Sequence, residues 1–232
     1  PRECTTLEID LKNFSEKLDT NIKGLKIGIA PQYEEVTVDK MIYKKIEEAI
    51  EVLKDLGAKV VEVDLPNLKR ALPAYYLINY VEFFSATRKF DGRKYGKRIE
   101  EVCGEEVLRR ILLGSYISQK EYRGKYYHKA IKTRSAIKRE TLEAFKQADV
   151  LISPTVPKLP HKFGVKLTPI EMYGYDFLTI PTNLAGICAG VLPAGKIDGI
   201  PIGLQIQGKP LDELTVFKVM KAYEEATYES NW

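Results

Sequence analysis

Few side chains in this sequence could carry chemistry, and they lie far apart along the chain. Ser153 ends an apolar run and precedes Pro154, a position where an exposed hydroxyl could serve as a nucleophile. No Gly-x-Ser-x-Gly motif surrounds it, and no obvious base is near it in the sequence. Because hydroxyls at strand ends and turns commonly bond local backbone groups, the sequence favours a structural role for Ser153.

The histidines and cysteines suggest no metal site. His128 and His161 are distant in sequence and fit no metal-ligand spacing, so both are predicted to be surface or loop residues. Cys4, Cys103 and Cys188 are odd in number and contain no C-x-x-C pair, which argues against a disulfide framework and against zinc. The sequence has no P-loop and no G-x-G-x-x-G motif, so we expect no ATP site within it.

The composition is typical of a globular protein in water, with 44% hydrophobic and 29% charged residues among 232. No stretch approaches the roughly 18–20 apolar residues of a membrane span, and no signal peptide opens the chain. The sequence therefore predicts a cytoplasmic protein that does not bind membranes. The net charge of +4 permits contact with nucleic acid without requiring it. Because the chain begins at Pro1, we expect it to be processed or excised from a longer polypeptide.

The first part of the chain predicts a strand–helix–strand unit. Leu25–Ala30 is a short apolar run that ends at Pro31, and Lys59–Val63 is another. Between them, apolar residues recur at helical spacing from Asp39, a good N-cap, to Gly57, a typical residue just past a helix. Such units normally place their two strands in parallel.

The middle of the chain predicts three helices. An aromatic-rich segment over residues 67–90 indicates a buried helix with some tyrosine hydroxyls aimed at a cavity, and Asp91-Gly92 then predicts a turn. A second helix is predicted over residues 98–114, with Gly114 as its end. The third is predicted over residues 118–148 and is rich in lysine and arginine.

The last part of the chain, residues 149–210, is apolar and rich in proline and glycine. Continuous apolar runs are typical of buried strands, and three are predicted at Val150–Ser153, Cys188–Leu192 and Ile202–Gln207. Asp198-Gly199 predicts a hairpin turn, and an amphipathic helix is predicted over Leu211–Thr227. The expected fold class is α/β, with a mixed β-sheet flanked by helices.

Several motifs resemble the amidase-signature family, and within it the A subunits of aspartyl/glutamyl-tRNA amidotransferases. They are "LISPTVP", "YDFLTIPTNLAG" and "GIPIGLQIQGKPLDE", and upstream "GLKIGIAPQY", "ALPAYYLINYVEFFSATRKFDGRKYG", "RRILLGSY" and "YYHKAIKTRSAIKRE". The resemblance covers nearly the whole chain in one order. It implies an amidase-signature fold, of which residues 1–232 are the incomplete C-terminal part of one domain.

The resemblance also implies that the catalytic residues lie outside this sequence. The family's Ser–cis-Ser–Lys triad occupies a Gly/Ser-rich region, and "PRECTT" at residues 1–6 resembles the segment that follows that region. We therefore expect the triad upstream of Pro1, no catalytic residue within the chain, and no activity of this chain alone.

A glutamine site is implied as well. In the family, a Tyr, an Arg and an Asp hold free glutamine, and the matching motifs place them at Tyr75, Arg110 and Asp176. An Arg fork suits the α-carboxylate, and an Asp accepts from the ammonium. The structural alternatives are core packing for the Tyr, a surface salt bridge for the Arg, which sits beside Arg109, and a turn for the Asp. The adjacent Tyr76 leaves the register of the Tyr open by one residue.

The leading hypothesis is the glutaminase subunit of a tRNA-dependent amidotransferase, which releases ammonia to convert Glu-tRNA(Gln) or Asp-tRNA(Asn). The resemblance implies B and C partner subunits, ATP and Mg²⁺ held by the partner, and mischarged tRNA reached through the complex. Residues 118–148 are a candidate surface for tRNA or the B subunit, although a solvated face is the simpler interpretation. The alternatives are a stand-alone hydrolase of a small amide and a non-catalytic split or remnant module.

Overall fold

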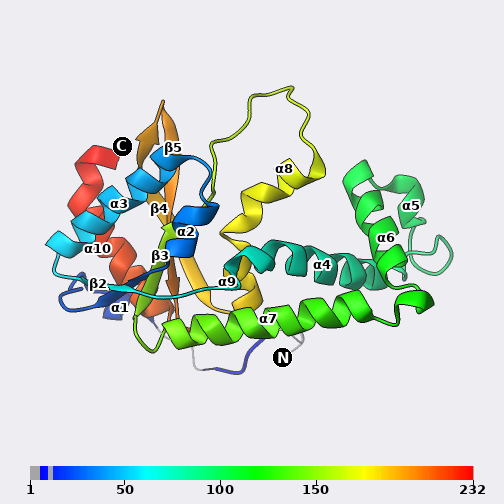
Figure 1. Ribbon diagram of the computed structural model, residues 1–232, viewed down its shortest axis with the longest axis horizontal. Helices are drawn as coiled ribbons and strands as arrows, with labels where there is room; N and C mark the ends of the chain where they lie inside the picture. The colour runs from blue at the N-terminus through cyan, green and yellow to red at the C-terminus, as the bar shows by residue number, and fades with distance from the viewer. Residues whose placement is uncertain (1–5, 10–12, 232) are drawn as a thin grey trace.

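The computed structural model describes residues 6–9 and 13–231, so Cys4 and most of the "PRECTT" segment lie outside it (Figure 1). In the described part of the chain, a five-stranded sheet has the order β2-β1-β3-β5-β4. Its strands are β1 (Lys26–Ile29), β2 (Lys59–Glu62), β3 (Val150–Pro154), β4 (Cys188–Ile197) and β5 (Ile200–Gly208). The helices are α1 (Phe14–Lys17), α2 (Pro31–Val36), α3 (Lys40–Asp55), α4 (Ala71–Thr87), α5 (Ile99–Val102), α6 (Glu105–Ile117), α7 (Lys125–Ala144), α8 (Pro169–Tyr173), α9 (Ile180–Ala185) and α10 (Glu213–Asn231), with short 3₁₀ turns η1 (Leu68–Arg70), η2 (Lys120–Tyr122) and η3 (Gly174–Phe177).

The sheet is parallel on one side and antiparallel on the other, which confirms the predicted mixed sheet. β1 pairs in parallel with both β2 and β3. β5 pairs antiparallel with β3 and β4. The β4–β5 hairpin turns at Asp198 and Gly199, whose φ angles of 50° and 80° are those of a type I′ turn. All five strands form where the sequence predicts them. The predicted burial of Cys188–Leu192 is wrong, because β4 lies at the edge of the sheet and its Val191 is 48% exposed.

The central strands are covered on both faces. On one face, Val150 and Ile152 of β3 pack with Leu204 and Ile206 of β5 beneath α3 and α10 (Figure 1). On the other, Leu151 packs among residues of α2 and of the segment that ends α7. Successive side chains of a strand point to opposite faces. Every residue of β3 is consequently buried, although the strand lies in a sheet of only modest width.

Helices α4, α6, α7 and α9 pack together beside the sheet (Figure 1). α4 lies at the centre of this group and contributes Ala71, Ala74 and Tyr80 to its core. α7 joins the group to the sheet. Its Ala130 packs in the core of the helix group, whereas its last residue, Ala144, packs against the sheet. With 20 residues, α7 is about 30 Å long, and it runs along the helix group and ends beside the sheet (Figure 1).

Gly114 does not end a helix, contrary to the prediction from sequence. The segment over 98–114 forms the short α5 and then α6, which continues past Gly114 to Ile117. Gly114 is buried where α6 contacts α4, and an added Cβ would overlap the carbonyl oxygen of Tyr80 and lie 2.6 Å from Cβ of Phe84. A glycine is needed here because two helix backbones approach closely.

Other helix boundaries also differ from the sequence-based prediction. Left-handed backbone at Arg123 (φ 45°) and Gly124 (φ 71°) breaks the segment over 118–148, so that α7 covers only Lys125–Ala144. The segment over 67–90 divides into η1 and α4. α1, α2, α8 and α9 were not predicted. The expectation for α3 is confirmed, since Asp39 accepts a hydrogen bond of 2.9 Å from the backbone of Met41.

We expect Gly114→Ala to lower the free energy of unfolding by roughly 2 kcal/mol, the range typical of overpacked sites, even though alanine favours helix. Gly174→Ala is the matched control. Gly174 has φ −58° and open space around an added Cβ, so its variant should change stability by no more than about 0.5 kcal/mol. Chemical denaturation of the native protein measures both. Equal midpoints for the two variants would contradict the close-packing argument.

Candidate functional site

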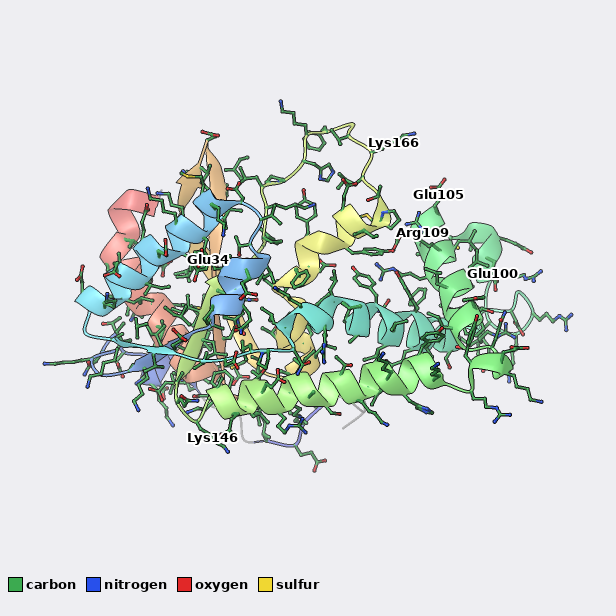
Figure 2. The ribbon with its side chains drawn as sticks, viewed as in Figure 1. Glu34, Glu100, Glu105, Arg109, Lys146 and Lys166 are labelled. Atoms are coloured by element: carbon green, nitrogen blue, oxygen red, sulfur yellow. The ribbon has the colours of Figure 1, made fainter. Side chains whose placement is uncertain are left out.

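A cluster of polar and aromatic side chains lies where α4, α6 and the α8–η3 segment meet. Its members come from three stretches that are far apart in the sequence, and we name it the α4–α6–α8 cluster: Tyr76, Asn79, Glu106, Arg110, Tyr173 and Asp176. Figure 2 labels Arg109, next to the cluster, in the space between α6 and α8, and Glu105 at the start of α6.

Helical spacing and close packing together align the cluster. Glu106, Arg110 and Gly114 are four residues apart, so they follow one face of α6. Tyr76 and Tyr80 are likewise one turn apart on α4. The contact of Gly114 with the backbone of Tyr80 therefore lies one helical turn from the place where Arg110 meets Tyr76.

Arg110 is held in place by an acid on its own helix and by an amide on α4. Its Nε donates to Oε1 of Glu106 at 3.0 Å, and its Nη1 donates to Oδ1 of Asn79 at 3.3 Å. Arg109 donates to the other oxygen of Glu106 at 2.5 Å. The Arg110 side chain is 27% exposed, so it is partly shielded but still open to a ligand.

Tyr76 connects the arginine to the aspartate. Its hydroxyl donates to Oδ2 of Asp176 at 2.7 Å, and its ring centroid lies 5.9 Å from the guanidinium carbon of Arg110. The ring of Tyr173 stacks on it at 4.0 Å, and the Tyr173 hydroxyl donates to Glu106 at 2.8 Å. Both charged groups, Arg110 and Asp176, therefore contact one buried tyrosine.

The electrostatics keep these groups in defined protonation states. Burial alone would raise the pKa of Glu106, but the hydrogen bond from Tyr173 and the charges of Arg110 and Arg109 outweigh it and lower the pKa below its usual value. Burial and the neighbouring carboxylate of Asp176 raise the pKa of Tyr76 far above its usual value. Tyr76 thus remains a hydrogen-bond donor throughout the physiological range.

The structure brings two of the three sequence-predicted residues together, with a neighbour in place of the third. Arg110 and Asp176 both contact Tyr76, whereas Tyr75 lies edge-on to Tyr76 at 5.2 Å and packs with the apolar residues of the helix group. Sequence reasoning missed Glu106, although its position four residues before Arg110 is a recognisable ion-pair spacing. Nothing in the sequence pointed to Tyr173.

Ser153 is fully buried, so its hydroxyl is not exposed as a nucleophile would require. It accepts hydrogen bonds from the side-chain amides of Gln205 at 2.9 Å and Gln207 at 3.0 Å. The Gln205 amide also donates to the carbonyl of Leu178 at 3.0 Å, two residues beyond Asp176. The partners of Ser153 are side-chain amides of β5 rather than the local backbone groups that the sequence suggests, and this buried network anchors the segment that carries Asp176.

The described residues hold two free cysteines, Cys103 and Cys188, and no group of three or more potential metal ligands. Among the same residues, no helix has the length and apolarity to span a membrane.

The cluster can recognise a small ligand that carries both charges. Arginine has five N–H donors, and for Arg110 two of them have partners among the described residues, so the guanidinium retains donors for a carboxylate. Asp176 is exposed, and Tyr76 occupies only one of its two oxygens within the part of the chain that the structure describes. An α-amino acid presents both a carboxylate and an ammonium, and the charges of Arg110 and Asp176 are opposite to these.

Comparison with known proteins identifies the class. The model of the Amidase family matches residues 2–217, so the chain belongs to the amidase family. A bacterial aryl acylamidase of the amidase-signature enzymes has the same fold, with a TM-score of 0.82, 24% identity, and coverage of 100% of this chain and 48% of that one. The amidase-signature fold implied by the resemblance is confirmed.

Within the family, the chain is similar to proteins named as the A subunit of glutamyl-tRNA(Gln) amidotransferase. It is 56% identical to that of Methanocaldococcus jannaschii over 225 residues, 97% of this chain and 50% of the relative. It is 55% identical to that of Methanobrevibacter smithii, over 96% and 49%. The crystal structure of the corresponding protein from Thermotoga maritima superposes with a TM-score of 0.71 and 32% identity, over 90% and 44%. The chain thus spans about half the length of these relatives.

Because its folded pKa is depressed below the ordinary 4.5, Glu106 stabilises the folded state above that value, and its contribution is lost as the pH falls through the folded pKa. We expect Glu106→Gln to show a shallower loss of stability between about pH 6 and pH 3. The difference should be a few tenths of a kcal/mol, since the carboxylate is 34% exposed and solvent weakens its ion pairs. Denaturation at a series of pH values measures it.

Glu105→Gln is the matched control, because it removes the same charge from the preceding, exposed position (Figure 2). Its stability should follow the unaltered protein across the pH series. Identical acid profiles for the Glu106 and Glu105 variants would show that the ion pairs of Glu106 add nothing to folding.

Proposed function

We propose that this chain is the glutamine-binding part of a glutaminase subunit in a tRNA-dependent amidotransferase. One observation carries the proposal: Arg110 and Asp176, which are far apart in the sequence, both contact Tyr76. A guanidinium with unused donors and an exposed carboxylate suit the two charged ends of an α-amino acid. The identity of 56% to a glutamyl-tRNA(Gln) amidotransferase protein supports glutamine as the amino acid.

The chemistry we propose takes place beside this cluster, on residues outside the chain. A serine hydroxyl oxygen bonds to the side-chain carbonyl carbon of glutamine, and the C–N bond breaks. The nitrogen leaves as ammonia with the hydroxyl proton, and water then cleaves the ester to give glutamate. Backbone N–H groups around the carbonyl oxygen stabilise the intermediate. In this scheme the α4–α6–α8 cluster binds and orients the amino-acid end.

The remaining roles belong to partners. We propose that ammonia passes to a B subunit, which holds ATP and Mg²⁺ and amidates Glu-tRNA(Gln) or Asp-tRNA(Asn), with a C subunit completing the complex. The named relatives support the first of these tRNAs. The cytoplasmic location, the single domain and the absence of a cofactor in this chain stay predictions. A hydrolase of simple amides needs no Arg–Asp pair, so the geometry favours an amino-acid substrate.

The function is tested by following ammonia release from glutamine in two samples. We expect activity in the native assembly purified from its source and none in the 232-residue chain alone, since the proposal places the nucleophile elsewhere. Absence of glutaminase activity from the native assembly would refute the proposal. Activity in the isolated chain would instead show that its own residues carry the chemistry.

In the native assembly, Arg110→Ala should raise the KM for glutamine roughly ten- to hundredfold with a smaller change in kcat, because a hydrogen bond to a charged group is worth about 1.5–3 kcal/mol. Steady-state kinetics with glutamine measures both constants. An unchanged KM would remove Arg110 from the site.

Two variants serve as controls. Arg109→Ala removes a guanidinium of the same helix that is 39% exposed and interacts with Glu106 and Tyr173. Tyr75→Phe removes the hydroxyl that the motif suggests, on a ring that lies edge-on to Tyr76. Both should change KM by less than about threefold, a difference below roughly 1 kcal/mol. A larger effect of Tyr75→Phe than of Tyr76→Phe would reverse the assignment of the tyrosine.

A further inference from the structure

The loop over residues 88–98, which follows α4, concentrates positive charge. Its eleven residues contain one acidic side chain, Asp91, and six basic ones, namely Arg88, Lys89, Arg93, Lys94, Lys97 and Arg98. The loop lies at the end of α4 away from the sheet, near Glu100, which Figure 2 labels. We name it the basic loop.

The backbone of the basic loop is held in a defined shape. Asp91 and Arg98 form an antiparallel bridge that closes it. The Asp91 carboxylate accepts hydrogen bonds from the backbone N–H groups of Arg93 at 2.9 Å and Lys94 at 3.1 Å. Gly92 adopts φ 74° at the turn. The cations are therefore carried on an ordered frame, so less conformational entropy is lost when they bind a ligand.

Most of this charge has no acidic partner in the described part of the chain. Arg98 lies 3.8 Å from Glu100 and 3.6 Å from Glu101, and it is the one cation of the basic loop with ion pairs among the described residues. Backbone hydrogen bonds from Arg93 and Lys94 lower the pKa of Asp91, so its carboxylate is committed to the turn.

A cavity and two exposed rings accompany the charge. Three arginines of the loop, Arg88, Arg93 and Arg98, line a cavity of about 380 Å³, and the acidic residues Asp91 and Glu100 line it as well. The rings of Phe90 and Tyr95 are 38% and 52% exposed. Lys89 lies over the first at 5.1 Å and Lys94 over the second at 5.4 Å. Cations thus stand beside flat apolar surfaces.

We infer that the basic loop binds the phosphate backbone of an RNA, with unpaired bases stacking on its exposed rings. Guanidinium forks match phosphate oxygens, and aromatic side chains stack the splayed bases of single-stranded RNA regions. An acidic protein would satisfy the cations but gives no reason for the interleaved rings Phe90 and Tyr95. The inference rests on the proposed function only for its choice of tRNA as the probe.

The test compares the native assembly with the triple variant Arg93→Gln, Lys94→Gln, Lys97→Gln. All three side chains are exposed and outside every ion pair among the described residues, so the fold should be retained. A tRNA transcript is titrated at several salt concentrations. We expect binding to weaken about ten- to hundredfold near 0.15 M salt, and the slope of log affinity against log salt to fall by about 2–3.

The matched control is Lys132→Gln, Lys138→Gln, Arg139→Gln on α7, which removes the same charge from exposed positions. It should retain most of the affinity and the salt slope. A loss in the α7 variant but not in the loop variant would overturn the inference and assign RNA contact to α7. Equal small losses of affinity in the loop variant and the α7 variant would show that only net charge matters, and would also overturn the inference.

Photo-crosslinking locates the contact independently of total affinity. With 4-thiouridine in the tRNA, mass spectrometry should find the crosslinked peptide that contains Phe90 and Tyr95. Crosslinks confined to other segments would overturn the inference. It would also be overturned if the loop variant kept its tRNA binding but lost a protein chain that copurifies with the unaltered assembly. Glutaminase activity of the variant is measured separately, so failure of RNA binding remains distinguishable from failure of the proposed function.

Discussion

The close approach of α4 and α6 at Gly114 is the constraint on which the candidate site depends. A side chain at Gly114 would collide with the backbone of α4 at Tyr80. One turn earlier on each helix, the same spacing brings Arg110 over the ring of Tyr76. Ridges of two helices interlock over several turns, so a separation imposed at one contact is carried to the next. The packing of one glycine thereby sets the distance between Arg110 and the ring of Tyr76.

A second constraint comes from burial on both faces of the central strands. β3 presents Val150 and Ile152 to one core and Leu151 and Ser153 to the other. A buried hydroxyl without a partner costs free energy, and for Ser153 the amides of Gln205 and Gln207 on β5 supply the hydrogen bonds. Through the carbonyl of Leu178 the same network reaches the segment that bears Asp176. The sheet and the helix group thus each fix one charged end of the site.

Charge is organised differently in the α4–α6–α8 cluster and in the basic loop. In the α4–α6–α8 cluster, Glu106 accepts hydrogen bonds from two arginines and a tyrosine. The partly buried side chain of Arg110 is therefore oriented by its neighbours. In the basic loop, Asp91 accepts hydrogen bonds from the backbone N–H groups of the turn, while most of the cationic side chains are exposed to solvent. The first arrangement suits selection of one small zwitterion, since geometry is tightly set. The second suits a long polyanion, because many weak contacts add along a backbone.

The sequence by itself determined the elements that depend on local signals. The strands followed from continuous apolar runs, α3 from its periodicity and the cap at Asp39, and the hairpin from Asp198-Gly199. Tertiary structure decided what local signals leave ambiguous. Gly114 as a helix end and Gly114 as a helix contact look the same in sequence, and only the packing against α4 separates them. Tyr75 and Tyr76 are adjacent in sequence, but one position along a helix rotates the side-chain direction by about 100°. The packing of α4 therefore decides that Tyr76, rather than Tyr75, donates to Asp176. Tyr173 lies far along the chain from Tyr76, and contacts of that kind exist only once the fold brings the segments together.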